Sequence, residues 1–114
     1  GYVEAVTAAG TAPILAQGEF TQASGFAAAA RLLASSDRPD AIFAANDAMA
    51  IGVLLAIQEA GLRCPDDVAV VGFDDVPIAD LVRPGLTTLH IDIAGMGRRA
   101  VERLLADIEG GVAL

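Results

Sequence analysis

Two short apolar stretches set the architecture: residues 41–47 read AIFAAND, and residues 68–75 read VAVVGFDD. In both, an apolar run without alternation ends in amide or acidic side chains. Such a run indicates a strand that is buried on both faces, as helices on both sides of a parallel sheet produce. Between them lies an apolar helical stretch that Asp47 is expected to cap and that ends at Gly61. We therefore predict an α/β fold, an open parallel sheet with helices on both faces.

The flanking segments extend this alternation in both directions. Residues 2–9 are expected to be helical turns, Pro13–Gln17 a further strand, and residues 22–35 a helix that Thr21 caps. After a loop over residues 74–85, residues 86–91 are expected to be extended. Asp92 then caps an amphipathic helix that ends at Gly110-Gly111. The sequence thus predicts the order α-β-α-β-α-β, followed by an extended segment and a last helix.

Composition and charge exclude several classes of protein. Hydrophobic residues make up 54% of the 114 residues, which is too apolar for a disordered chain, yet no apolar run reaches the roughly 18 residues that span a bilayer. The net charge of −8 repels phosphate backbones, so this segment is not expected to bind nucleic acid through a basic face. A single cysteine, Cys64, excludes an internal disulfide and multi-cysteine zinc sites. No cofactor and no membrane contact are expected.

Polar and aromatic side chains follow each of the three predicted strands. Phe20 follows the first, Asn46 and Asp47 the second, and Asp74 and Asp75 the third. The carboxyl ends of parallel strands meet at one edge of a sheet, where ligands bind. Carboxylates accept hydrogen bonds and an aromatic ring offers an apolar face, so this edge suits a ligand rich in hydroxyl groups.

Each of these residues also has a structural interpretation that stays open. Asp47 is expected to act only as a helix cap, Asn46 fits a turn equally well, and one of Asp74 and Asp75 fits an Asx turn. Phe20 fits a core position as well as a ligand contact. The sequence therefore indicates where a site would form more firmly than it assigns each residue.

Catalysis is not expected from this chain. The sole histidine, His90, lies in the extended segment, and no Gly-x-Ser-x-Gly elbow supplies a nucleophile. Neighbouring carboxylates of one loop rarely converge on one bond, so Asp74 and Asp75 are poor candidates for acid–base work. The residues favour a binding protein over an enzyme.

A series of motifs occurs in an order and spacing that resemble one family. FAANDAMAIG occupies residues 43–52, GLRCPDDV residues 61–68, VGFDD residues 71–75 and PGLTT residues 84–88. GEF and SGF lie upstream within residues 18–26, and MGRRAV lies downstream at residues 96–101. Together they resemble the C-terminal half of the effector-binding domain of LacI/GalR-family transcriptional regulators.

This resemblance implies a type I periplasmic-binding-protein fold, in which two lobes close on a small molecule. Residues 1–85 would form most of the C-terminal lobe, residues 86–91 a segment that crosses to the N-terminal lobe, and residues 92–109 a helix that packs towards that lobe. The DNA-binding domain that contacts the operator is expected outside these 114 residues, in a cytoplasmic regulator. A periplasmic sugar-binding protein of a transporter is the alternative.

The resemblance also implies the ligand-binding residues. Asp74 would bond effector hydroxyl groups or ring nitrogens, Asn46 would touch a sugar, and Phe20 and Phe43 would supply aromatic contacts. The strand-edge argument reaches the first three of these residues independently, whereas Phe43 by itself fits the core. An acid-lined edge favours an uncharged sugar or polyol over an anionic ligand, which would need arginine. A purine is the less favoured alternative and stays open, because an aspartate can accept from its ring N–H groups.

A homodimer is expected from the helix over residues 48–57, which lacks a single polar side chain. A helix that is apolar all round is buried on all sides, either within its own fold or against a second copy. The resemblance places this helix and the loop after Asp75 at a dimer interface, so we expect an isologous contact through residues 48–60 and 76–84. The expected contact residues are Met49, Val53, Leu54, Ile57, Pro77 and Leu81.

Overall fold

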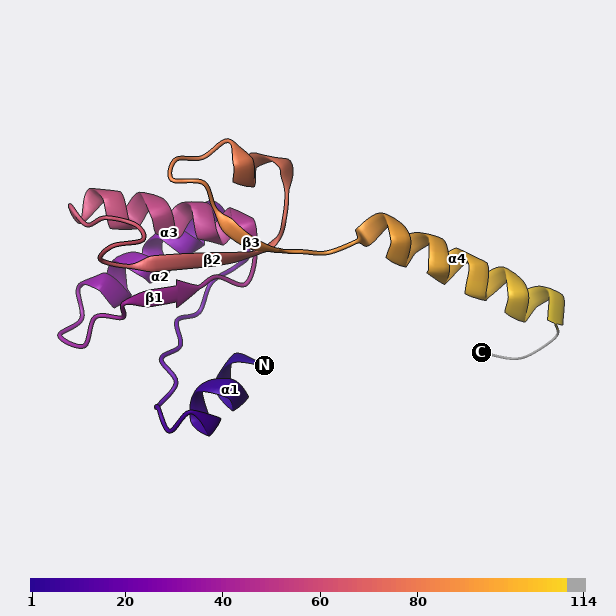
Figure 1. The fold of residues 1–114 in the computed structure, drawn as a ribbon, viewed down its shortest axis with the longest axis horizontal. Helices are drawn as coiled ribbons and strands as arrows, with labels where there is room; N and C mark the ends of the chain where they lie inside the picture. The colour runs from indigo at the N-terminus through magenta and orange to yellow at the C-terminus, as the bar shows by residue number, and fades with distance from the viewer. Residues whose placement is uncertain (111–114) are drawn as a thin grey trace.

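Three parallel strands form the centre of the molecule, in the spatial order β1 (Ala41–Phe43), β2 (Ala69–Asp74) and β3 (Thr87–His90). The computed structural model describes residues 1–110 (Figure 1). Val71 lies beside Phe43 on one side and beside Thr87 on the other, so the middle strand carries both ladders. The predicted open parallel α/β sheet is confirmed.

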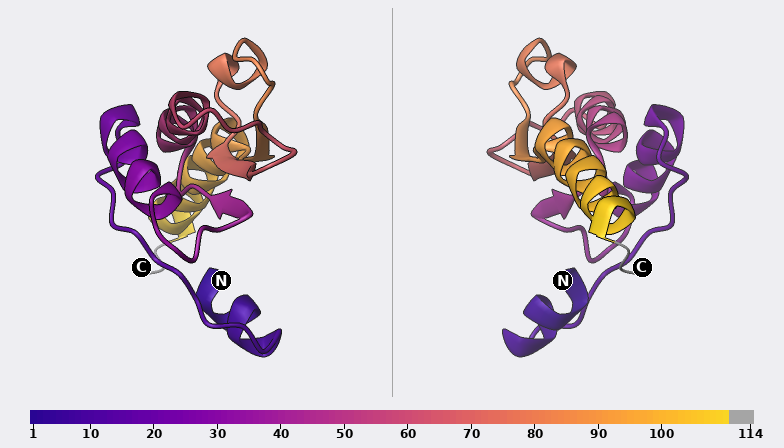
Figure 2. Two further views of the ribbon diagram at one scale, coloured as in Figure 1. Left: turned by 90° about the vertical axis from the view of Figure 1, so that its left-hand side faces the viewer. Right: turned by 90° about the vertical axis from the view of Figure 1, so that its right-hand side faces the viewer.

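Two helices form the packed layer on this sheet. Helix α3 (Asp47–Glu59) covers one face, and α2 (Gln22–Leu33) packs along α3 (Figure 2). The core lies between them and holds the buried side chains of Ala29, Ala44, Met49, Ala50, Val53, Ala56, Ile57, Val68 and Val70. In the described chain the packed helices lie on this face, whereas Phe43 and Leu89 remain about half exposed. Of the helices predicted on both faces of the sheet, the described chain thus packs helices on one face.

Glycines at the crossing let α2 and α3 approach closely. A Cβ atom on Gly25 would lie 2.6 Å from the Cα of Met49, and a Cβ atom on Gly52 would lie 2.6 Å from the backbone nitrogen of Phe26. Side chains normally keep at least about 3.4 Å from backbone atoms. Each helix thus presents a glycine to the backbone of the other, and this crossing fixes where α3 begins relative to the loop before α2.

The ends of the helices show which sequence-based caps form. The Thr21 side chain accepts from the Ser24 N–H in a capping box, and Asp92 accepts from the Gly95 N–H at 2.9 Å, so both predicted caps are confirmed. The predicted cap at Asp47 is wrong, because Asn46 is the N-cap residue of α3 and accepts from the Met49 N–H at 2.9 Å. Asp47 is the first residue of the helix, and its carboxylate is free to bond elsewhere.

The predicted strand at Pro13–Gln17 does not form. Helix α1 (Tyr2–Ala8) leads into this segment, which pairs with no strand in the described chain and leaves Leu15 70% exposed. A hollow of about 580 Å³ separates it from β1 and α2. An apolar run indicates burial, but a strand also needs a partner within hydrogen-bonding distance, and only tertiary structure supplies one.

The last helix, α4 (Ile93–Gly110), points away from the sheet (Figure 1). It ends at Gly110, and Gly111 lies outside the described residues. Its exposed apolar side chains are Ile93, Met96, Val101, Leu104, Leu105 and Ile108. Before it, η1 (Pro77–Asp80) interrupts the predicted loop, and residues 87–90 of the expected crossing segment belong to β3. The division into residues 1–85, 86–91 and 92–109 stays a prediction.

Candidate functional site

The candidate site lies where β1 and β2 end. Asn46 follows β1, and its Nδ2 donates to the backbone carbonyl of Phe20 at 3.1 Å, which ties the loop before α2 to the start of α3. Asp74 is the last residue of β2, and the neighbouring Asp47 bonds the Val76 N–H two residues beyond it at 2.9 Å. The structure therefore brings Phe20, Asn46 and Asp74 to one rim, as the strand-edge argument predicted, although Phe20 arrives from a loop and not from a strand.

The backbone at this rim is strained. Phe20, Asp74 and Asp75 have φ angles of 59°, 116° and 60°, and they are the only non-glycine residues with positive φ in the part of the chain that the structure describes. Side chains other than that of glycine rarely adopt this region, and such strain collects at functional sites, where surrounding contacts enforce it. Three instances at one rim distinguish it from the rest of the fold.

Both candidate aromatic residues are open to a ligand. Phe20 is 67% exposed and Phe43 is 48% exposed, and both line the hollow of about 580 Å³ beside β1. Neither ring is part of the core, so the interpretation of Phe20 and Phe43 as core residues is wrong. The Phe43 ring is solvated because its neighbours Ile42 and Ala44 face the core whereas Phe43 points to the other side of β1.

Asn46 has less hydrogen-bonding capacity left than the sequence suggests. Its Oδ1 accepts from the Met49 N–H, and its Nδ2 donates to the Phe20 carbonyl. An amide group has two N–H donors and two lone pairs, so one N–H and one lone pair remain. Asp74, by contrast, is half-buried, and no side-chain hydrogen bond to its carboxylate occurs within residues 1–110.

Behind the rim lies a hydrogen-bonded group that the sequence analysis missed. The Asp47 carboxylate is 0% exposed; Oδ2 accepts from the Val76 N–H, and Oδ1 accepts from the Thr88 hydroxyl at 2.6 Å. Asp75 Oδ2 lies 2.9 Å from His90 Nδ1. Only the PGLTT motif at residues 84–88 marked Thr88 in the sequence, because Asp47 and Thr88 are 41 positions apart.

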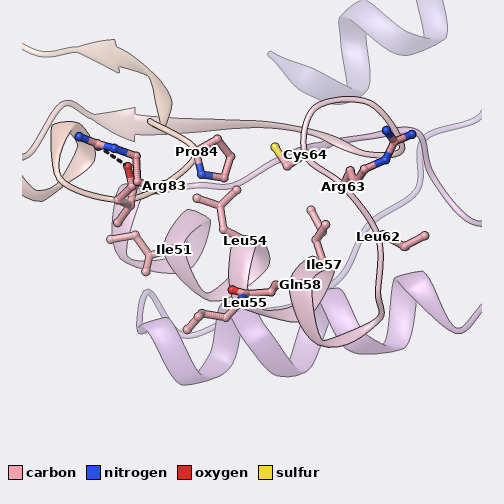
Figure 3. A pocket seen from close by; sticks show the side chains of 11 residues that line it. Ile51, Leu54, Leu55, Ile57, Gln58, Leu62, Arg63, Cys64, Arg83 and Pro84 are labelled. Atoms are coloured by element: carbon pink, nitrogen blue, oxygen red, sulfur yellow. Dashed lines mark hydrogen bonds between the residues drawn. The ribbon is translucent and has the colours of Figure 1, made fainter.

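A second hollow, of about 430 Å³, lies on the outer face of α3. It is bounded by Leu54 and its neighbours on that helix, by the turn that contains Cys64, and by residues 82–84 (Figure 3). Figure 3 shows Leu54 pointing towards Pro84. The apolar outer face of α3 thus packs incompletely against this loop. This is the surface that was predicted to contact a second copy.

Half of the predicted dimer contacts face the wrong way. Met49, Val53 and Ile57 are buried in the chain's own core, against α2 and the sheet, so no second copy reaches them. Leu54 is half-buried, Pro77 is exposed, and Leu81 is 74% exposed. Helical periodicity gives the reason, because Met49 and Val53 share the inner face of α3 whereas Ile51, Leu54, Leu55 and Gln58 point outward. Ile57 lies between these faces, since it is buried in the core and also lines the second hollow. The sequence could not distinguish these faces, since both are apolar.

The turn beside this hollow carries the two perturbed ionisable groups. The Arg63 N–H donates to Asp67 Oδ2 at 2.8 Å, and this bond, with the Arg63 guanidinium nearby, lowers the pKa of the Asp67 carboxyl. Burial raises the pKa of the Cys64 thiol, and the Asp66 carboxylate adds to the effect. Cys64 is therefore a poor nucleophile.

Residues 1–110 show neither a metal-binding cluster nor a helix that could span a membrane. No group of three His, Cys, Asp or Glu side chains is placed to hold a metal ion there. No helix in the same residues has the length and apolar character to cross a membrane.

Comparison with known proteins identifies the family. The periplasmic binding protein-like domain matches residues 1–113. The lactose operon repressor of Rhizobium radiobacter is 49% identical over 87 residues, which cover 76% of this chain and 77% of that sequence. The chain belongs to the LacI/GalR family of transcriptional regulators. Another relative of this LacI/GalR chain, the HTH-type transcriptional repressor PurR of Mannheimia succiniciproducens, is 44% identical over 94 residues, 82% of this chain and 28% of that protein.

Solved structures show the same fold as this LacI/GalR chain. A LacI family regulator from Arthrobacter sp. FB24, in complex with lactose, matches with a TM-score of 0.87 and 37% identity over 97% of this chain and 41% of that one. The lac repressor dimer bound to operator and an anti-inducer matches with a TM-score of 0.92 and 35% identity, over 99% of this chain and 40% of that one. The chain thus spans about two fifths of each of these regulators.

Proposed function

We propose that this chain is the effector-sensing and dimerisation part of a cytoplasmic LacI/GalR regulator, which binds a small sugar-like molecule between two lobes. The observation that carries the proposal is the strained rim that brings Asp74, Asn46 and two exposed aromatic rings together. The names of the relatives, which are repressors, favour a regulator over the periplasmic binding protein of a transporter and over an enzyme.

Each rim residue has a role that its contacts allow. Asp74 accepts hydrogen bonds from ligand hydroxyl groups, since no described side chain occupies its carboxylate. Asn46 contributes its remaining N–H, because its other groups hold Met49 and Phe20 in place. Phe20 and Phe43 pack against the apolar face of the ring.

The proposed ligand is a sugar or polyol rather than an anion, and a purine is the alternative. As far as the structure describes it, the hollow that holds Phe20 and Phe43 has no arginine in its lining, which a phosphate or carboxylate would need. The similar regulator from Arthrobacter sp. FB24 is in complex with lactose, which supports the sugar.

Regulation follows from a second lobe that contributes the other half of the site. The apolar side chains of α4 are exposed in the described chain, and their packing on that lobe would bury them. Effector bonded by both lobes favours the closed arrangement and so shifts the population of DNA-binding states. Contact with operator DNA belongs to a separate domain, since the net charge of this chain is −8.

A thermal-shift assay on the intact regulator tests the ligand site, with lactose, ribose and adenine as probes. A sugar at about 100 times its Kd should stabilise the protein by about 2.7 kcal/mol. Asp74→Ala should abolish this shift, whereas Asp37→Ala, which changes an exposed carboxylate in the turn after α2, should keep it. A full shift in the Asp74 variant would remove that residue from the site, and a shift with adenine alone would replace the sugar by a purine.

The homodimer is proposed to form through the outer face of α3 and the loop of η1. Its contacts are Ile51, Leu54, Leu55, Pro77, Ile78 and Leu81, which replace the buried residues of the original prediction. The lac repressor that matches this chain is a dimer, which supports the arrangement. Leu55→Glu should give monomers in sedimentation velocity, whereas Ala30→Glu on the exposed side of α2 should leave dimers. Dimers in both variants would place the interface elsewhere.

A further inference from the structure

The turn that carries Asp74 is held in a conformation that its own sequence does not favour. Asp74 and Asp75 both have positive φ, and neither is glycine. Backbone of this kind persists only where surrounding contacts over-determine it. A free turn of this sequence would relax and redirect the Asp74 carboxylate, so some other group must fix it.

Asp47 supplies the first anchor. Its carboxylate is fully buried at the first turn of α3, and a Cβ atom on Gly72 would overlap it. No salt bridge within the described chain pairs this charge, so its hydrogen bonds from Val76 and Thr88 are what offsets its desolvation. Because leaving such a group unsatisfied is costly, Asp47 holds the Val76 N–H, two residues after Asp74, in place.

Thr88 supplies the second anchor and connects it to the first. Its hydroxyl donates to Asp47 and also accepts from the Asp75 N–H at 3.4 Å. Thr88 lies on β3 beside Gly72 of β2, so the strand ladder fixes its own position. At the far end, His90, which is paired in register with Asp74, bonds the Asp75 carboxylate. The amides of both residues that follow Asp74 are thereby fastened to α3 and β3.

We infer that Thr88, acting with Asp47, is a positioning residue for the effector site: its hydroxyl fixes the strained turn that holds Asp74 at the rim where the effector is proposed to bind. This inference rests on the proposed function only in its last clause, since the anchoring of the turn is a property of the chain itself. Thr88 makes no contact with the ligand in this arrangement, because its hydroxyl faces the buried Asp47 carboxylate.

The strand offers a matched set of variants for the test. Thr88→Val removes the hydroxyl and keeps the shape of the side chain, whereas Thr88→Ser keeps the hydroxyl. Thr87→Val makes the same chemical change one position earlier, on an exposed residue for which the described chain shows no side-chain hydrogen bond. Lactose binding by calorimetry and amide hydrogen exchange at residues 70, 75 and 76 would be measured in the intact regulator.

Thr88→Val should raise the Kd for lactose by about tenfold or more, the typical effect of losing a hydrogen bond to a charged group. It should also speed amide exchange at Asp75 and Val76 while leaving Val70, in the middle of β2, as slow as before. Thr88→Ser and Thr87→Val should match the wild type in both measurements.

Three other results would contradict parts of this expectation. An unchanged Kd and unchanged exchange in Thr88→Val would overturn the inference, and so would faster exchange at Val70 to the same degree as at Val76, which marks general destabilisation. If the wild type binds no lactose, lactose is not the effector, and the sugar that the thermal-shift assay selects replaces it as the probe. Amide exchange at Asp75 and Val76 then still tests whether Thr88 anchors the turn. Faster exchange in Thr88→Val alone would support the anchoring, and unchanged exchange in Thr88→Val would refute it.

Discussion

Replacing Gly52 by alanine tests whether the α2–α3 crossing depends on backbone contact. A Cβ atom there would lie 2.6 Å from the Phe26 nitrogen and 3.1 Å from the Gln22 carbonyl carbon, both of which are backbone atoms. Unlike the end of a flexible side chain, these atoms cannot rotate away. The two helices would therefore have to separate by about 1 Å to restore ordinary contact in a close-packed interior.

Two opposing effects set the magnitude. Overpacking of this kind costs about 1–3 kcal/mol, and the upper part of that range applies where backbone must move. Alanine in a helix interior is favoured over glycine by about 1 kcal/mol. We expect Gly52→Ala to lower the free energy of unfolding by about 1–2 kcal/mol, which corresponds to a fall in Tm of roughly 4–16 °C for a domain of this size.

Urea denaturation followed by circular dichroism measures this change, and α4 offers the control. Gly97 lies inside that helix, and a Cβ atom on it would meet nothing within 4 Å. Gly97→Ala should leave the unfolding midpoint unchanged or raise it. If Gly52→Ala also proved as stable as the wild type or more so, helix propensity would dominate and the close crossing would be refuted.

Three smaller predictions concern single side chains. The Arg63 N–H and guanidinium lower the pKa of Asp67, so the stabilising contribution of this carboxylate is present above about pH 4 and is lost as the pH falls further. Asp67→Asn should therefore make the unfolding midpoint fall less steeply with decreasing pH. An equally steep fall in the variant would contradict this. Burial raises the pKa of the Cys64 thiol, so iodoacetamide at pH 8 should modify this thiol more slowly in the folded chain than in the urea-unfolded chain. Equal rates of modification would count against the burial. Asn46→Ala should cost about 1 kcal/mol in a denaturation experiment and Asn46→Asp much less, because aspartate also caps; equal losses would show that the bond to Phe20 matters more than the cap.

Much of the fold follows from patterns that neighbouring residues make. The apolar runs that became β1 and β2, the caps at Thr21 and Asp92, and the polar residues after β1 and β2 are local signals, and the structure contains them. The placement of Asn46 and Asp74 at one rim also follows, since parallel strands place their carboxyl ends together, whereas Phe20 reaches that rim from a loop through the bond between Asn46 and its carbonyl.

The errors lie where one pattern fits two arrangements. Asn46 and Asp47 are both good caps, and the helix uses Asn46 because the Asp47 carboxylate satisfies Val76 and Thr88 instead. The segment Pro13–Gln17 has the composition of a strand but no partner in the described chain. Phe43 follows the same rule, because its exposure depends on which face of the sheet α3 covers.

By itself, then, the sequence of this chain determined most of the succession of helices and strands and the edge of the sheet at which Asn46 and Asp74 lie, because hydrophobic period and capping act over a few residues. Tertiary structure alone decided which face of α3 is buried, why Phe20 and Phe43 are open, and how Thr88 reaches Asp47 across 41 positions. The physical reason is that burial and hydrogen-bond partners depend on distances in space, and an apolar helix or a buried carboxylate carries no local mark of the group it will face.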